Sequence, residues 1–224
     1  MWGRSHCPDC GRVIRSHHLV PIISWILLRG YCVDCHKPIH IQYPLVELAA
    51  AILMLIAFLR HNFFLAPFAL ESFLFETLFS FILLFVSIFD LRWKLIPVEL
   101  LLASTSIFTV WSFLTMHFSL WHLVLGIAIG FFFLGIQVWV SRGKWMGEGD
   151  PWIGAFLGAA LGWPGIGISL YVTYIVGAVV AFAIFFSGEY RRGFRIPFAP
   201  LLSLGGLGAL WFGSSILSWL TQTF

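Results

Sequence analysis

Long apolar stretches separated by short polar segments occupy most of the chain after residue 43. They cover 45–59, 67–89, 97–116, 120–140, 152–187 and 197–220. A helix needs about 20 apolar residues to cross a bilayer, so most of these stretches predict one span each. The longest, 152–187, is interrupted by Gly-Trp-Pro-Gly at 162–165, which predicts a short span, a turn and another span. Because backbone polar groups in lipid must be bonded internally, we expect an all-α protein with about seven transmembrane helices.

The composition agrees with this pattern. Hydrophobic residues make up 60% of the 224 residues and charged residues only 10%. A soluble domain carries about 25% charged residues, so the chain is expected to be an integral membrane protein in contact with the lipid bilayer. The net charge of +3 is too small to indicate a nucleic-acid partner.

A polar module, residues 1–43, precedes the apolar region 44–224, and we expect these to be two domains. All four cysteines lie in the module as two pairs with two residues between partners: Cys7 and Cys10, and Cys32 and Cys35. Two such pairs are typical of a tetrahedral four-thiolate zinc site. Four protein ligands leave no open coordination position, so the predicted zinc is structural.

Other interpretations of the module remain open at this point. The cysteines could be free thiols or a redox pair, and His6 or His36 could replace one cysteine as a ligand. The apolar segment Val20–Leu28 is interrupted by Pro21 and is too short to cross a bilayer. We expect it either to pack against the metal module or to lie at the membrane interface.

The basic residues predict the orientation. All thirteen Lys and Arg residues except Arg60 fall in the module or in the loops on its side of the membrane, which contain 92–94, 142–144 and 191–195. Such a bias places these segments in the cytosol. The module, Asp90 and Asp150 are therefore expected on the cytosolic side, where thiols stay reduced.

Asp90 and Asp150 are the candidate catalytic residues. Each lies at one end of an apolar stretch, and carboxylates at membrane depth are energetically costly. Two nearby carboxylates that share one proton can activate water, as in aspartic proteases. The simpler alternatives are that Asp150 only caps a helix with Pro151 in its first turn, and that Asp90 pairs with Arg92 or Lys94.

Five further residues carry structural or functional hypotheses. Gly147 and Gly149, in Gly-Glu-Gly-Asp, are expected to let the backbone turn sharply and approach a substrate closely. Glu148 between them either meets a basic substrate residue or is simply solvated. Glu76 is expected near mid-membrane in a helix-packing contact, whereas Glu47, close to the cytosolic interface, is the better candidate for a functional acid.

The chain resembles the type IV prepilin peptidases, which are GxGD-type intramembrane aspartic proteases. The resemblance spans nearly the whole chain and rests on RSHCPDC, PIISWILLRGYCVDC, YPLVELAAA, DLRWKLIP, GEGD and IPFAPLLSLG. It implies that Asp90 and Asp150 are the catalytic pair. It matches the four cysteines to the family's cytosolic module, and it places the following motif near the active site: Pro197, Phe198, Ala199 and Pro200.

The resemblance also implies an activity. Such enzymes remove the basic leader from prepilins and pseudopilins at the cytosolic face of the bacterial inner membrane, cutting after a Gly. Many then methylate the new N-terminus with S-adenosylmethionine, for which Glu47 is a weak candidate contact. A transporter or channel with a proton relay is the rival function, but it predicts acidic residues through the whole membrane depth. A methyltransferase without protease activity is disfavoured by the intact aspartate motifs.

Two departures from the family pattern are visible. Members usually carry another transmembrane helix before the cysteine module, whereas this chain begins at Met1 close to Cys7. Members also often carry a Lys two residues after the GxGD aspartate, and Trp152 occupies that position here.

Overall fold

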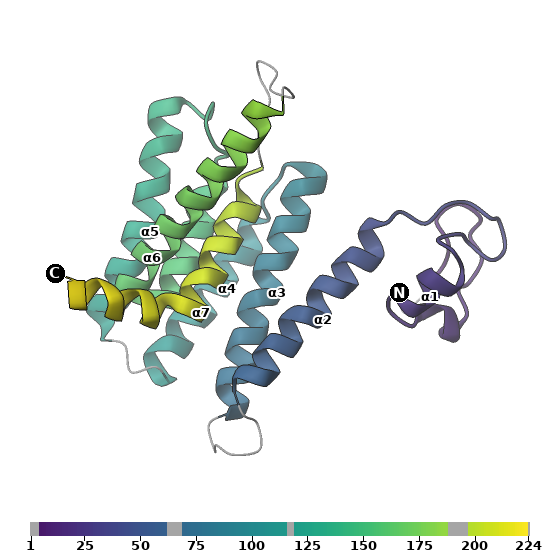
Figure 1. Cartoon of the computed structure of the whole chain (residues 1–224), viewed down its shortest axis with the longest axis horizontal. Helices are drawn as coiled ribbons and strands as arrows, with labels where there is room; N and C mark the ends of the chain where they lie inside the picture. The colour runs from purple at the N-terminus through teal and green to yellow at the C-terminus, as the bar shows by residue number, and fades with distance from the viewer. Residues whose placement is uncertain (1–4, 62–68, 116–118, 188–196, 224) are drawn as a thin grey trace. The chain divides into compact units, whose positions relative to one another are not determined.

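The computed structural model describes residues 5–61, 69–115, 119–187 and 197–223. These residues form two compact units, 1–81 and 82–224, whose boundary lies within a helix. Figure 1 shows the elements along the chain. They are the 3-10 helix η1 (Ser16–Leu19), α1 (Ile23–Leu27), α2 (Gln42–Arg60), α3 (Ala69–Trp93), α4 (Val98–Thr115), α5 (Leu120–Ser141), α6 (Asp150–Phe186) and α7 (Ala199–Thr223).

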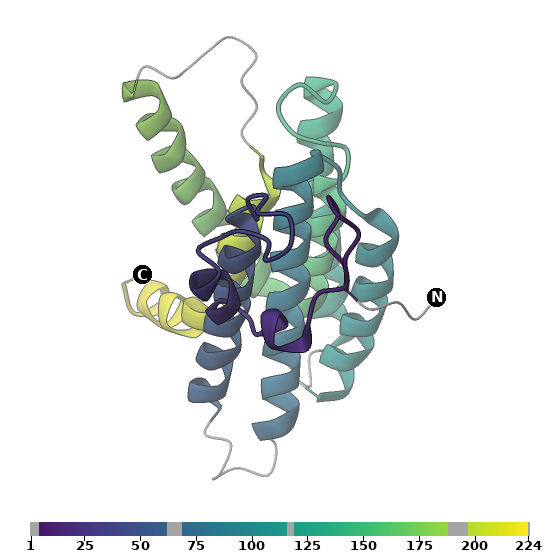
Figure 2. The same cartoon turned by 90° about the vertical axis from the view of Figure 1, so that its right-hand side faces the viewer.

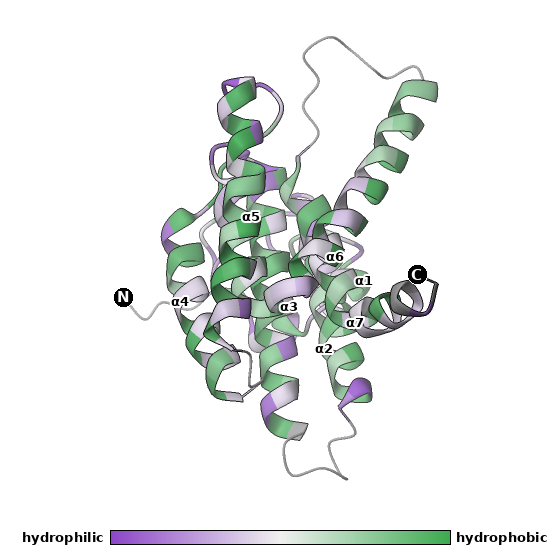
Figure 3. Cartoon of the chain, turned by 90° about the vertical axis from the view of Figure 1, so that its left-hand side faces the viewer, coloured by the Kyte–Doolittle hydropathy of each residue, from purple (hydrophilic) through white to green (hydrophobic). Residues whose placement is uncertain are grey.

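The prediction of a polytopic helical membrane protein is confirmed. Within the described ranges, the six helices α2 to α7 are long and apolar enough to cross a membrane. Figure 3 shows hydrophobic residues along most of their length, with the most hydrophilic segments toward helix ends and loops. The observed bounds differ from the predicted ones by only a few residues. The largest consequence is in α3, which continues to Trp93 and so places Asp90 inside its last turn.

Helix α6 is broken where the sequence predicts a turn. Gly162 has φ 60° and ψ −171°, a conformation open to glycine, and the next residue, Trp163, is also non-helical. The break divides α6 into a first half, 150–161, and a second half, 164–186. The second half lies at an angle to α5 and diverges from it toward residue 186 (Figure 2). The two helices still touch, because the hydroxyl of Tyr174 in the second half donates a hydrogen bond to Gln137 of α5 over 2.7 Å. The expected break is thus present between two helical segments, and together they form one of the six candidate spans.

The first half of α6 is the centre of the unit 82–224. Nearly all of its residues are buried. The ring of Phe156 lies 5.2 Å from that of Phe108 in α4, and the hydroxyl of Ser112 in α4 donates to the carbonyl oxygen of Ala159 over 3.0 Å. Its apolar surface is thus covered by protein rather than by lipid.

Glycines bring α5 and the first half of α6 into backbone contact. A Cβ added at Gly130 would overlap the carbonyl oxygen of Gly154, and a Cβ added at Gly158 would overlap that of Gly126. Glycines four residues apart on both helices therefore permit the close approach typical of membrane helix pairs. The lower-numbered glycine of α5 faces the higher-numbered glycine of α6, so the two helices run antiparallel. These contacts fix the position of one helix along the other.

That register shows that Asp150 is recessed. Gly126 faces Gly158 and Gly130 faces Gly154, so Asp150 lies level with Leu134. Helix α5 continues for seven more residues, to Ser141, and each residue adds about 1.5 Å. Asp150 therefore lies about 10 Å below the end of α5.

In the unit 1–81, α2 and α3 are joined near their shared loop end. The rings of Phe58 and Phe73 lie 6.5 Å apart, edge to face. The buried carboxylate of Glu76 lies 2.7 Å from Nε2 of His61 and 3.4 Å from Nε of Arg60. The expected packing contact is present, and it joins Glu76 to the last turn of α2, whereas the expected mid-membrane depth stays a prediction.

Candidate active site and cysteine cluster

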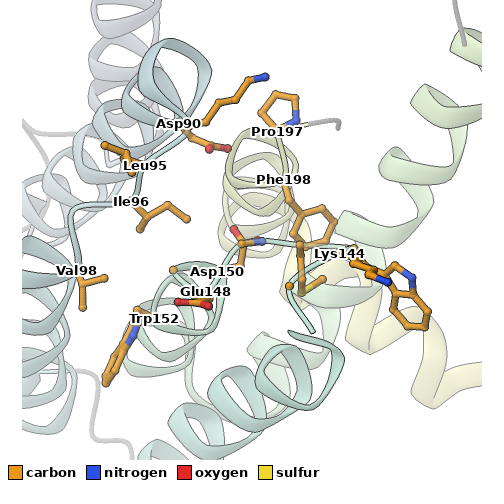
Figure 4. A pocket seen from close by; sticks show the side chains of 16 residues that line it. Asp90, Leu95, Ile96, Val98, Lys144, Glu148, Asp150, Trp152, Pro197 and Phe198 are labelled. Carbon is orange, nitrogen blue, oxygen red and sulfur yellow. The ribbon is translucent and has the colours of Figure 1, made fainter. Parts of the chain in front are cut away.

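Asp90 and Asp150 line the same cavity in the unit 82–224. Its volume is about 530 Å³, and Figure 4 shows both carboxylates projecting into it from different elements. The wall is formed by three chain segments: the end of α3 with the following loop and the start of α4 (Asp90, Lys94, Leu95, Ile96 and Val98), the loop before α6 with the first turn of α6 (Gly143 to Asp150, with Trp152), and the two residues before α7 (Pro197 and Phe198). The sequence motifs around both aspartates and the motif at 197–200 thus meet in one place.

Asp90 is held by the start of α7. Its side chain is largely buried, at 8% exposure, and its Oδ2 accepts a hydrogen bond from the backbone N–H of Ala199 over 3.3 Å. One turn earlier in α3, the hydroxyl of Ser87 donates to that of Ser203 in α7 over 2.7 Å. These contacts fix the Asp90 carboxylate against α7, and in the described part of the chain it forms no ion pair with Arg92 or Lys94.

Asp150 is bonded by the loop that precedes it. It is 2% exposed, and its Oδ2 accepts the backbone N–H of Gly147 over 2.8 Å. Pro151 does occupy the first turn of α6, as the capping alternative requires. However, the carboxylate bonds backward to the loop rather than to the amide groups of its own helix. The side chain therefore shapes the Gly-Glu-Gly-Asp loop around the cavity.

Gly149 of this loop packs directly on another segment. It has φ −83°, which any residue adopts, and Gly147 is not among the described residues with positive φ. A Cβ on Gly149 would come within 2.5 Å of the Cβ of Ile96, so glycine is needed at 149 because the Ile96 loop packs on it. The chain does turn here, since the N–H of Asp150 bonds the carbonyl oxygen of Gly147 over 3.2 Å, and the close approach to a substrate stays a prediction.

Aromatic side chains outside the motifs support the cavity wall. The ring of Phe198 lies 6.0 Å from that of Tyr174, whose hydroxyl bonds Gln137. The ring of Trp152 lies 4.9 Å from that of Phe131. Sequence analysis missed Tyr174 and Gln137, because both lie within apolar stretches and nothing in the local pattern distinguishes them.

The cavity surrounds the two carboxylates with both polar and apolar groups. The two observed hydrogen bonds engage Oδ2 of each aspartate, which leaves Oδ1 of each for a water molecule or a substrate carbonyl. Ile96 and Phe198 supply apolar wall, while Lys94 and the exposed Glu148 supply charge near the carboxylates. A polar pair in a partly apolar, recessed cavity can exclude bulk water from the reacting atoms.

The four cysteines in the module form one cluster. Their Sγ atoms all lie within 4.8 Å of one another, and those of Cys7 and Cys35 are 3.9 Å apart. In a tetrahedral Zn–S₄ site with Zn–S bonds of about 2.3 Å, the sulfur atoms lie about 3.8 Å apart. The cluster therefore fits a tetrahedral metal site.

The two cysteine pairs are built alike. In each, the first cysteine donates its N–H to the residue five positions later, from Cys7 to Arg12 and from Cys32 to Lys37, over 2.9 Å. These two basic residues reach across to the other pair: Arg12 bonds Asp34 over 2.8 Å, and Lys37 bonds Asp9 over 2.7 Å. Sequence analysis missed this exchange, although the repeat CPDCGR and CVDCHK could have indicated it.

The pKa values of the two thiols in the second pair are shifted in opposite directions. The backbone N–H groups of Cys35 and Asp34 lower the pKa of the Cys32 thiol to about 7. The N–H of Lys37 favours ionisation of Cys35, but partial burial and hydrogen bonds with the neighbouring thiols outweigh it and raise the pKa of Cys35 to about 11. The neighbouring thiols thus oppose ionisation of Cys35, and a bound cation would remove that conflict.

Glu47 lies at the junction of the module and the first membrane helix. It is in α2, five positions after the helix begins at residue 42, and its Oε2 accepts the backbone N–H of Ile22 over 2.7 Å. The two residues are 25 positions apart, so the contact ties α2 to the module.

Comparison with known proteins connects these features. The bacterial peptidase A24 N-terminal domain matches residues 1–61, and the type IV leader peptidase family matches residues 77–185. The chain is 33% identical to the prepilin leader peptidase/N-methyltransferase of Aeromonas hydrophila, covering 99% of this chain and 76% of that protein. The proteins of the same name from Burkholderia pseudomallei strain 1026b and Bacillus subtilis strain 168 are 33% and 29% identical, with 68% and 84% of their lengths covered. No solved structure matches the chain.

The matches to the family models and to curated relatives extend over nearly the entire chain, including the cysteine cluster and both aspartates. Its similarity to these relatives identifies this multi-pass helical membrane protein as a peptidase. The chain belongs to the type IV leader peptidase family.

Proposed function

We propose that this protein is an aspartic endopeptidase that removes the leader peptide from type IV prepilins or pseudopilins, with Asp90 and Asp150 as its catalytic residues. The observation that carries the proposal is the shared cavity: two buried carboxylates, distant in sequence, line the same 530 Å³ space in a chain of the leader peptidase family. The prepilin substrate is inferred from the names of the relatives.

In the proposed mechanism the two aspartates share one proton. The ionised carboxylate takes a proton from a water molecule, and the resulting hydroxide attacks the scissile carbonyl carbon. The protonated carboxyl donates its proton to the carbonyl oxygen as the tetrahedral intermediate forms. The amide N–H groups of Ala199 and Gly147 hold Oδ2 of Asp90 and Asp150, so the reacting oxygens are kept in position.

The proposed reaction takes place at the cytosolic face of the bacterial inner membrane. The support is the distribution of basic residues. The loops around Lys94 and Lys144 belong to the set of segments that carries nearly all Lys and Arg residues, and such segments are typically cytosolic. Both loops line the cavity, so the reacting carboxylates lie at the same end of the bundle. A proton relay across the membrane needs acidic residues at several depths and is not favoured by this arrangement.

We further propose a second activity, N-methylation of the newly formed N-terminus with S-adenosylmethionine as methyl donor. The support is the shared name of the relatives, prepilin leader peptidase/N-methyltransferase. Glu47 is the candidate contact for this donor, although its Oε2 already accepts the N–H of Ile22.

The metal proposed for the cysteine cluster is a structural zinc ion held by Cys7, Cys10, Cys32 and Cys35. The spacing of the sulfur atoms fits a tetrahedral site, and the exchange of ion pairs between the two cysteine pairs supports the same geometry. Zinc would cross-link the module, and with four thiolate ligands it would take no part in hydrolysis.

The test is cleavage of a purified prepilin by the full-length protein in nanodiscs, with and without S-adenosylmethionine, read as the mass of the product. The wild type should yield a leaderless pilin, heavier by one methyl group when the donor is present. Asp90→Asn and Asp150→Asn should each lower the cleavage rate by at least about 10³-fold, because each removes half of one proton-sharing unit.

Glu99→Gln is the matched control. It makes the same carboxylate-to-amide change in the exposed first turn of α4, outside the cavity, and should cleave at the wild-type rate. Wild-type cleavage by either aspartate variant would overturn the mechanism. If cleavage occurred only when another protease was added, and was then equal in the wild type and all variants, the peptidase assignment itself would be overturned.

A further inference from the structure

We propose that one face of the cysteine module is a membrane-docking surface, which inserts into the headgroup region of the leaflet that α2 enters. The surface consists of five apolar residues in and before α1, here called the apolar ridge: Leu19, Val20, Ile23, Ile26 and Leu27. The occupant is the lipid surface, with anionic headgroups. The proposal is independent of the peptidase activity.

The apolar ridge is exposed although it lies outside every candidate span. Ile23, Ile26 and Leu27 are 57%, 61% and 76% exposed, and they share one face of α1 because they are three and four positions apart. Leu19 and Val20 extend the surface at 48% and 43% exposure. Several large apolar side chains gathered on a small polar module indicate a binding surface.

The other face of α1 is already committed to the module. The hydroxyl of Ser24 donates to the carbonyl oxygen of His17 over 3.0 Å, and Nε1 of Trp25 donates to the carbonyl oxygen of Ile39 over 3.2 Å. The Trp25 ring also lies against Gly30, where an added Cβ would come within 3.0 Å of it. The two alternatives for the segment 20–28 are therefore compatible: one face packs on the module and the opposite face is left for lipid.

A strained turn and Glu47 fix where α1 begins. Ile22 has φ 63° and ψ −52°, and the N–H of Ile23 bonds the carbonyl oxygen of Pro21 over 2.5 Å, which is the rare γ-turn. A β-branched residue adopts positive φ only where the surroundings enforce it. The enforcing contact is the hydrogen bond from the Ile22 N–H to the Glu47 carboxylate, 2.7 Å long.

This contact sets the depth of the apolar ridge. Helix α2 has 19 residues, about 28 Å, which is close to the thickness of the hydrocarbon core. Its beginning at Gln42 therefore lies near the headgroup boundary, and Glu47 lies about 7.5 Å further along the helix. A helix in the interface buries its apolar face about 5–10 Å into this boundary. Glu47 thus holds α1 at the height where such helices lie.

The charges around the apolar ridge select anionic lipid. Between Cys10 and Asp34 the chain contains no Asp or Glu, whereas Arg15 and Arg29, on either side of the ridge, are both exposed. The acidic residues of the module, Asp9 and Asp34, are paired with basic residues at the cysteine cluster. Basic residues beside an apolar face are attracted to a negatively charged membrane surface.

The test uses a photo-crosslinking amino acid in the full-length protein, placed at Ile23 or at Val13, in nanodiscs with phosphatidylglycerol or with phosphatidylcholine alone. Val13 is the matched control, because it is 51% exposed and lies in the first cysteine pair's loop rather than on the ridge. Ile23 should give lipid adducts, at least about fivefold more than Val13, and more with phosphatidylglycerol.

Glu47→Ala tests the depth setting. It should lower lipid adducts at Ile23 severalfold while the zinc content stays at one per chain, which shows that the module remains folded. Adducts from Ile23 mainly to other residues of this protein, or equal lipid adducts from both positions, would overturn the proposal. Unchanged adducts in Glu47→Ala would overturn the role of Glu47.

Discussion

The cysteine module and the aspartate cavity hold their polar groups in different ways. In the module, contacts join residues at most 28 positions apart, and its ion pairs are exposed to solvent. In the cavity, Asp90 is held by Ala199, 109 positions away, through a buried hydrogen bond. The module therefore depends on a few local ligands, whereas the cavity depends on the packing of four helices. A change that damages one region should spare the other.

Loss of the cysteines is the strongest test of this difference. Replacing Cys7 and Cys10 together by Ser should reduce zinc to well under one per chain, because metal binding and folding of so small a module are coupled. We expect methylation to fall by at least about tenfold and cleavage by less than about threefold, since the helical core has its own packing. Zinc content, leader removal and product mass are measured on one preparation.

His36→Asn is the control for the zinc ligands. His36 has φ 53°, a conformation that Asn tolerates, and it adjoins Cys35 without belonging to the thiol cluster. It should retain one zinc per chain. Full zinc retention in the double cysteine variant would contradict the four-thiolate site, and equal loss of both activities would show that the module also shapes the aspartate cavity.

Moving α5 away from α6 should have the opposite effect to the loss of the cysteines: cleavage should fall while zinc binding is kept. Gly130→Ala places a Cβ against the carbonyl oxygen of Gly154, so the helices must move apart. Overpacking of this kind costs about 1–3 kcal/mol. We expect a lower melting temperature and a loss of cleavage with zinc unchanged. Gly135→Ala in the same helix meets no atom within 4 Å and should be neutral or slightly stabilising, and equal destabilisation by both changes would refute the contact.

The smallest effect should come from Tyr174. Tyr174→Phe removes the hydroxyl that bonds Gln137 but keeps the ring beside Phe198. One hydrogen bond contributes about 0.5–1.5 kcal/mol, so cleavage should fall by about two- to tenfold. Tyr174→Ala also removes the ring and should be worse, whereas zinc should be unchanged in both. An alanine variant as active as the phenylalanine variant would show that the ring does not support the cavity wall.

Much of the architecture follows from local pattern. Hydropathy located every long helix within a few residues, and Gly-Trp-Pro-Gly located the break in α6, because both depend on neighbouring residues. The spacing of Cys7, Cys10, Cys32 and Cys35 predicted the cluster for the same reason. We inferred from charge bias and family resemblance that Asp90 and Asp150 lie together. Both indicate the side of the membrane on which the two residues lie, but not which groups bond their carboxylates.

What could not be predicted depends on tertiary packing. Gly149 meets Ile96, more than 50 positions away, and the local pattern Gly-Glu-Gly-Asp does not indicate this contact. The contact of Glu76 with His61 was not predicted either, because hydropathy does not show which side chains meet across two helices. The contact between Tyr174 of α6 and Gln137 of α5 depends on the direction that the chain takes after Gly162.

The depth of Asp150 sets a minimum length for the unfolded part of a substrate. The carboxylate lies about 10 Å below the end of α5, and a bond inside a regular helix keeps its carbonyl oxygen occupied. An extended chain advances about 3.3 Å per residue, so a substrate entering over the end of α5 needs about three extended residues to reach the aspartates. On the proposed function, the site would accept substrate chains that unwind over that length and would exclude helices that stay intact.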